Sequence, residues 1–125
     1  MREESSNLII VKSMNFAIRC VNLKKYLNNE KHEFDIARQL FRSGTSIGAN
    51  TKEALRGQSK SDFRAKMNIS LKEASESEYW IDLLFNTDYI DEKEYMSLKA
   101  DCIEILKILT SIVKNSAEDT ATAQL

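Results

Sequence analysis

The chain contains no proline, and glycine occurs only three times in its 125 residues. Glycine and proline strongly disfavour a helix interior, and the tight turns of sheet proteins depend on them. A chain that nearly lacks both is suited to long helices joined by short loops. Apolar residues make up 42% of the sequence and charged residues 30%. This composition is typical of a globular protein and excludes a chain that is disordered throughout or embedded in a membrane.

Helical periodicity divides the chain into four segments, in which apolar residues recur every three or four positions. These segments cover about residues 8–27, 34–56, 59–86 and 91–115. Capping patterns mark two of the starts, because Ser59 precedes Asp62 by three positions and Asp91 precedes Glu94 by three. Four amphipathic helices with short connections predict an all-α protein, an antiparallel up-and-down four-helix bundle.

The predicted bundle is a single domain of residues 8–115, with a disordered segment at 1–7 and a flexible C-terminal tail at 116–125. A chain of this length can bury about two-thirds of its unfolded surface, which is enough for a core. Cys20 and Cys102 are far apart in the sequence, and each falls on an apolar stripe, so we predict buried free thiols. The N-terminal segment has no secretory hydrophobic region, and we expect a cytoplasmic protein.

The first predicted helix carries two apolar stripes. We assign the first stripe to the bundle core: Ile10, Met14, Ala17, Ile18 and Val21. The second contains Ile9, Phe16, Cys20, Leu23 and Leu27. Surplus apolar surface usually marks a partner surface, so we predict a homo-oligomer. The predicted interface residues are Ile9, Phe16, Leu23, Leu27, Ile69, Trp80 and Leu83. The alternative is that these residues complete one wide core face.

Charge is distributed unevenly along the chain, although the net charge is only -1. Residues 38–66 carry seven basic and two acidic side chains, whereas residues 73–104 carry ten acidic and two basic ones. On a helical wheel the cations of the second helix fall within about 40° of one another, away from the apolar seam. Together with two cations of the third helix they form the predicted basic strip: Arg38, Arg42, Lys52, Arg56, Lys60 and Arg64. Such a strip can follow a phosphate backbone without reading base sequence. The alternative is a solvated face without a partner.

Several polar residues of the second and third helices are candidates for a cluster: Asn50, Glu53, Lys72, Glu73 and Glu76. Metal sites in helix bundles use Glu-x-x-His motifs, which the sequence lacks, and the single histidine, His32, falls in a loop. A salt-bridge network between helices is therefore favoured over a metal or acid–base site. Phosphate-binding and nucleophile-elbow motifs are also absent from the sequence. We predict a non-enzymatic protein without metal, cofactor, small-molecule substrate or membrane partner.

Three runs occur in order along the chain: SIGANTKEA at 46–54, SKSDF at 59–63 and KEASESEYWIDLL at 72–84. They resemble bacterial four-helix bundle proteins related to the large-subunit ribosomal RNA intervening-sequence protein and to the accessory protein of diversity-generating retroelements. The resemblance covers about residues 8–114 and implies assembly into a ring, typically a pentamer. It favours an oligomeric bundle that binds RNA or DNA non-specifically through the basic strip. The alternative function is a protein-interaction scaffold without nucleic-acid binding.

Overall fold

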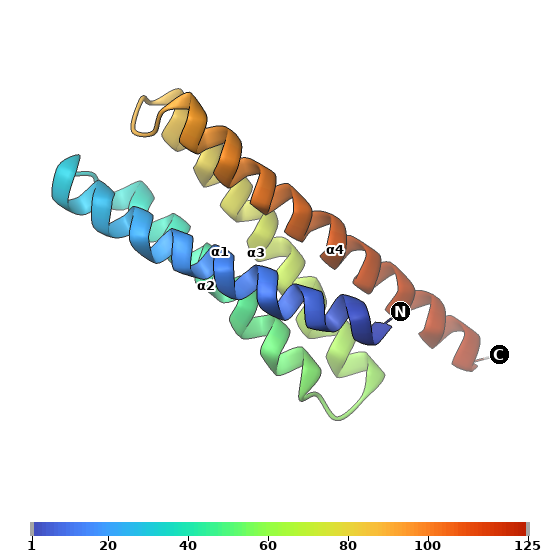
Figure 1. Ribbon diagram of the computed structural model, residues 1–125. Coiled ribbons are helices and arrows are strands. Elements are labelled where there is room, and N and C mark those ends of the chain that lie inside the picture. Colours follow the sequence, from blue (N-terminus) through green and yellow to red (C-terminus); the bar gives the residue numbers. More distant parts are fainter. Residues whose placement is uncertain (1, 125) are drawn as a thin grey trace.

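The computed structural model describes the backbone of residues 2–124 and the side chains of residues 6–116. Within this part of the chain it contains four α-helices: α1 (Arg2–Glu30), α2 (Asp35–Leu55), α3 (Lys60–Asn86) and α4 (Glu92–Gln124). Successive helices pack side by side and α4 packs back on α1, whereas in the diagonal pairs, α1 with α3 and α2 with α4, no Cα atoms of described residues lie within 8 Å of each other. This arrangement is the predicted antiparallel up-and-down bundle (Figure 1).

Both termini and the α2–α3 loop lie at one end of the bundle, and the α1–α2 and α3–α4 loops lie at the other (Figure 1). The predicted caps of α3 and α4 are confirmed. Ser59 accepts a hydrogen bond from the backbone N–H of Asp62 at 3.0 Å, and Asp91 accepts one from Glu94 at 2.8 Å. The start of α2 uses a residue that the sequence placed only in a loop, because the buried carboxylate of Glu33 accepts three backbone N–H groups of the first turn.

The helices extend beyond the predicted limits of the bundle. The segment 1–7, predicted to be disordered, is helical from Arg2, and α4 continues as helix to Gln124 through the tail predicted to be flexible. Neither outer segment contains a glycine or proline that would end a helix. The helical backbone therefore extends past the predicted domain limits at both ends, whereas the disorder of 1–7 and the flexibility of 116–125 stay predictions. Met1 and Leu125 lie outside the described residues.

The two apolar stripes of α1 have the opposite orientation to the one predicted. The second stripe lies in the core, where Ile9, Phe16 and Leu27 are at most 1% exposed. The first stripe faces outward, and Met14 is 61% exposed. The prediction that Ile9, Phe16, Leu23 and Leu27 form an oligomer interface is therefore wrong, because the bundle itself buries all four. A helix with two apolar stripes about a third of a turn apart has no periodicity signal that decides which of them faces inward.

Small residues allow α2 and α3 to approach closely. The hydroxyl groups of Ser43 and Ser77 lie 2.8 Å apart across this interface. About two turns further along, Ser70 donates to the backbone oxygen of Ile47 at 2.8 Å and lies 3.1 Å from the hydroxyl of Thr51. These fully buried hydroxyl groups all have partners, so their burial does not leave an unsatisfied polar group. Ser43 and Thr51 of α2 therefore serve helix packing.

The thiols of Cys20 and Cys102 are free and at most 1% exposed, as predicted. Burial raises the pKa of each thiol to about 12, so both remain protonated at neutral pH. Because the thiolate is the reactive form, we expect less than about one tenth of a thiol per chain to react with a disulfide reagent within an hour at pH 8. In denaturant both thiols should react at once. Rapid reaction of the folded protein would contradict this packing of the core.

Candidate nucleic-acid interface

The six cations of the predicted basic strip are all exposed on the surface of α2 and α3. Those of α2 follow the outer side of the helix for most of its length. Arg38 and Arg56 stand at opposite ends of α2, about 27 Å apart along its axis at 1.5 Å per residue. The strip therefore exists as a geometric feature. Whether each cation can meet a phosphate depends on its neighbours, and these divide the strip into two parts.

Arg42, in the first half of α2, is held by two carboxylates of α3. Its guanidinium group lies 3.4 Å from Glu73 and in direct contact with Glu76. Glu76 also accepts a hydrogen bond from the indole N–H of Trp80 at 2.9 Å. A phosphate at Arg42 would have to compete with both carboxylates, so this residue is better placed to join the two helices. Arg38 is paired only loosely, with Asp35 at 3.8 Å, and both side chains are largely exposed.

The other four cations gather where α2 ends and α3 begins. Lys52 and Arg56 lie at the end of α2, and Lys60 and Arg64 lie in the first turns of α3. None of the four forms an ion pair with a described residue. Such unpaired exposed ammonium and guanidinium groups are available to phosphate oxygens. We call this group, Lys52, Arg56, Lys60 and Arg64, the basic end.

The α3–α4 corner at the opposite end of the bundle is acidic, while cations of α1 and α2 also lie at that end. Asp88, Asp91 and Glu92 are exposed in the α3–α4 loop and at the start of α4, where the nearest cation in the sequence is Lys93. The antiparallel fold thus converts the uneven charge along the sequence into a charge difference along the long axis of the bundle. A polyanion approaching this molecule is attracted to the basic end and repelled by the acidic α3–α4 corner.

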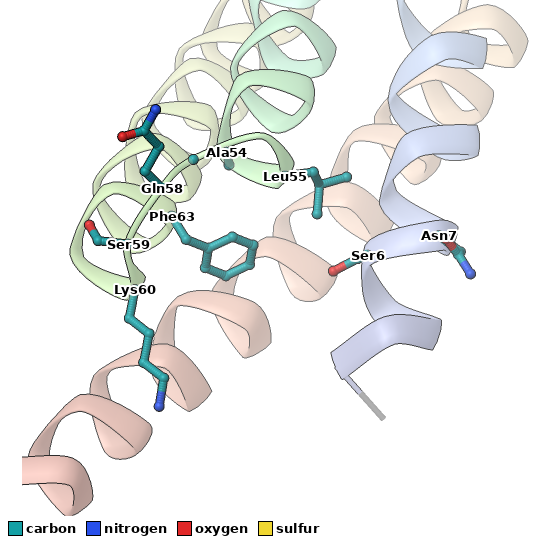
Figure 2. A pocket seen from close by; sticks show the side chains of 9 residues that line it. Ser6, Asn7, Ala54, Leu55, Gln58, Ser59, Lys60 and Phe63 are labelled. Atoms are coloured by element: carbon teal, nitrogen blue, oxygen red, sulfur yellow. The ribbon is translucent and has the colours of Figure 1, made fainter.

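An open pocket of about 600 Å³ lies beside the basic end, between the start of α1 and the α2–α3 loop. Figure 2 shows Phe63 and Ser6 pointing toward one another across it, with Leu55 above and Lys60 at its edge. Phe63 belongs to the buried core, and the residue is 6% exposed. The pocket therefore places a concave, partly apolar surface next to the cations. Nothing in the sequence pattern signalled it, because its walls come from three separate segments.

The predicted polar cluster does not form as one group. The amide of Asn50 donates to the backbone oxygen of Ser46 within α2 at 2.9 Å, and Glu53 lies 3.8 Å from Lys66. Only Glu73 and Glu76 come together, and they do so around Arg42. The predicted salt bridging between α2 and α3 is confirmed, with Arg42 as its centre. Across the described residues, no three His, Cys, Asp or Glu side chains are arranged to hold a metal ion.

The α1–α4 seam is closed by ion pairs that the sequence did not reveal. Arg19 lies 2.7 Å from Asp101 and 3.2 Å from Glu94, and Lys12 lies 2.7 Å from Glu104. The hydrogen bond from Lys12 to Glu104 raises the pKa of Lys12, which favours its charged form. These contacts neutralise part of the acidic surface of α4. They leave the basic end untouched, so the charge difference along the bundle persists.

The fold and the basic end together describe a small all-α protein with a group of cations at one end of the bundle. The profile of the 23S rRNA-intervening sequence protein family matches residues 6–111, and the chain belongs to this family. It is similar to a protein of unknown function from the S23 ribosomal protein family of Bacteroides thetaiotaomicron VPI-5482, whose crystal structure shares 52% sequence identity and a TM-score of 0.86. That match covers 88% of this chain and 98% of the other. No curated protein matches the chain.

The predicted resemblance to this family is therefore confirmed. In the described part of the chain, no helix combines the length and apolar character that crossing a membrane requires.

Proposed function

We propose that this protein is a non-enzymatic homo-oligomer, a ring of four-helix bundles that binds RNA or DNA through phosphate contacts at the basic end. The observation that carries the proposal is the concentration at one end of the bundle of four exposed cations that form no ion pair with any described residue. The proposed binding site is smaller than the predicted basic strip, because the guanidinium group of Arg42 is paired with Glu73 and Glu76. The buried free thiols fit a reducing compartment, and we place the protein in the cytoplasm.

Binding through phosphates requires little more than matched charge. Lysine and arginine side chains displace counterions from the nucleic acid, and the release of these ions supplies most of the binding free energy. The four side chains of the basic end are long and exposed, so they can adjust to different backbone paths. We therefore expect weak preference for base sequence. A ring would present several basic ends to one polyanion, which raises the overall affinity above that of a single copy.

Self-association is supported by the outward stripe of α1. Its large apolar side chains remain between 44% and 61% exposed in a single copy: Leu8, Ile10, Val11, Met14 and Ile18. Single exposed apolar residues are common on protein surfaces, but a row of five on one helix usually marks an interface. Burial of this row against another molecule would remove it from water.

The proposal is tested by titrating a fluorescent single-stranded RNA, and separately a duplex DNA, with the purified protein and following anisotropy. We expect micromolar binding at about 50 mM salt. For single strands, each neutralised phosphate contributes about -0.7 to the slope of log affinity against log salt, so about four contacts predict about a 50-fold loss between about 50 mM and about 200 mM salt. Absence of binding at low salt, or binding that is insensitive to salt, would contradict the proposal.

A protein-interaction scaffold without nucleic-acid binding is the second candidate. The outward row of α1 favours it as well, since the same apolar surface can receive a different protein. The titration separates the two functions. A folded protein that retains its apolar surface but binds neither RNA nor DNA at low salt would belong to the scaffold class.

A further inference from the structure

Ser6, near the start of α1, is an exception among the buried polar side chains of the described residues. It is 8% exposed, and its hydroxyl group forms no hydrogen bond with a described residue. The other buried polar side chains each have a partner: Ser13, Glu33, Ser43, Thr51, Ser70, Ser77 and Ser116. No fully enclosed polar atom of the described side chains lacks a partner, so the oxygen of Ser6 reaches open space. This hydroxyl group is therefore free to bind a ligand.

The open space at Ser6 is the pocket beside the basic end. Figure 2 shows the oxygen of Ser6 directed across this pocket toward the ring of Phe63. The volume of about 600 Å³ falls within the range of small-molecule sites, which is about 300 to 1,000 Å³. Ala54, Leu55 and Phe63 give the pocket apolar walls. A ligand of matching chemistry has an apolar part and a group that accepts a hydrogen bond from Ser6.

The polar lining of the pocket supplies hydrogen-bond donors and a positive charge. Lys60 is the one ionisable residue among the described residues that line it, and its ammonium group forms no ion pair with them or with any other described residue. The backbone N–H groups of Gln58, Ser59 and Lys60 also form no hydrogen bond within the described chain. These groups lead into the start of α3, where the helix dipole favours an anion. The lining therefore favours an anion with several acceptor oxygens.

Acidic side chains do not line this pocket among the described residues. The nearest one in the sequence is Asp62, in the first turn of α3. It lines a different pocket, together with Glu53 and Lys66. An anion beside Ser6 and Lys60 would therefore meet donors without a described carboxylate in the same cavity.

We propose that this pocket binds a phosphate monoester carried by a nucleotide, with the phosphate at Ser6 and Lys60 and the nucleoside against Leu55 and Phe63. A phosphate monoester carries a charge of about -1.5 to -2 at pH 7 and offers three acceptor oxygens, whereas a phosphate within a strand carries a single negative charge. Two sources provide this group: the 5′ end of a nucleic-acid strand and a free nucleoside monophosphate. The first source rests on the nucleic-acid binding proposed above, since Lys60 belongs to both the basic end and the pocket.

Titrations with three single-stranded RNAs, followed by anisotropy of a dye at the 3′ end, test the site. One strand has a 5′-phosphate and the second a 5′-hydroxyl. The third is a 5′-hydroxyl strand longer by two nucleotides, which matches the charge that the phosphate adds. We expect the 5′-phosphate strand to bind about 10-fold more tightly than either hydroxyl strand at about 50 mM salt, because a hydrogen bond to a charged group contributes about this much. Calorimetric titration with adenosine 5′-monophosphate, with adenosine as its control, tests the free nucleotide.

The variant Ser6→Ala removes the hydroxyl donor without changing the charge. We expect it to reduce the advantage of the 5′-phosphate strand to less than about 3-fold and to leave binding of the hydroxyl strands unchanged. Thermal stability should not fall, since the hydroxyl group of Ser6 has no partner among the described residues. The matched control is Ser13→Ala, which removes a buried hydroxyl group of the same helix outside the pocket. It should keep the full advantage of the 5′-phosphate.

The outcomes separate the two sources from each other and from failure. A 5′-phosphate advantage that Ser6→Ala removes assigns the pocket to strand ends. Binding of adenosine 5′-monophosphate that Ser6→Ala removes, without a preference among the strands, assigns it to free nucleotides. Equal binding of the three strands without binding of the mononucleotide, or a preference that persists in Ser6→Ala, would overturn the inference and leave the basic end in place. Failure of all three strands to bind at low salt would instead contradict the proposed function, and the mononucleotide would still report on the pocket.

Discussion

Simultaneous reversal of charge at the basic end, with Lys52, Arg56, Lys60 and Arg64 all changed to glutamate, is expected to weaken binding to single-stranded RNA at least about 100-fold at about 50 mM salt. Each substitution removes a phosphate contact and places a negative group where the backbone would lie. The four positions are exposed and form no ion pairs with described residues, so the fold should tolerate the change. Fluorescence anisotropy measures the affinity, and circular dichroism verifies the fold.

A control variant with the same change in net charge separates a local site from a general charge effect. Lys25, Lys31, Arg38 and Lys93 are exposed and lie toward the opposite end of the bundle. Their replacement by glutamate should lower the affinity by less than about 10-fold, through long-range repulsion alone. Equal losses in the two variants would show that net charge governs binding and would refute the basic end as the site. The control also tests Arg38, which the sequence assigned to the strip.

The second large effect is expected in the core, from Gly44→Ala. A Cβ atom at Gly44 would overlap the Sγ atom of Cys20 and lie 3.2 Å from its Cβ atom, with the ring of Phe16 at 3.4 Å. Both neighbours are at most 1% exposed, so neither has free space to move into. Overpacking a core typically costs about 1 to 3 kcal/mol, which exceeds the gain of up to about 1 kcal/mol from better helix propensity. We expect a net loss of about 2 kcal/mol in urea-induced unfolding.

Two comparison variants locate the cause of that loss. At Gly48 a Cβ atom would lie 3.2 Å from the hydroxyl oxygen of Ser13 and 3.5 Å from its Cβ atom, so Gly48→Ala should change stability by less than about 1 kcal/mol. In the Gly44→Ala background, Cys20→Ala removes the overlapping sulfur. The double variant should be more stable than the sum of the single effects predicts, by about 1 kcal/mol or more. Strict additivity would mean that the helices do not approach as described.

The fold could be predicted from the sequence because nearby residues determine the apolar period of each helix and mark the starts of α3 and α4. The absence of proline, the spacing of Ala37, Leu40 and Ile47, and the caps at Ser59 and Asp91 are local signals, and the structure confirms them. The orientation of α1 is different. Two stripes of similar apolar character compete for the core there, and packing against α2 decides the outcome. The tight fit of Cys20 on Gly44 places the second stripe inside.

The candidate site was predicted only in part for a related reason. A helical wheel shows which cations share a face, and on that basis Arg38 and Arg56 are equivalent. It does not show which of them meets a carboxylate from another helix. Arg42 pairs with Glu73 and Glu76, which lie more than thirty positions away in the chain. Such pairs depend on the register between α2 and α3, and this register is known only from the packed structure.

Photo-cross-linking tests directly whether nucleic acid binds at the basic end, because it reports where the nucleic acid lies on the wild-type protein. A single-stranded RNA containing 4-thiouridine would be bound at low salt, irradiated, and the cross-linked peptides identified by mass spectrometry. Binding at the basic end predicts cross-links within residues 52–66, and these cross-links should disappear at high salt. Cross-links at the acidic end, around residues 86–94, or no cross-links at low salt would contradict it.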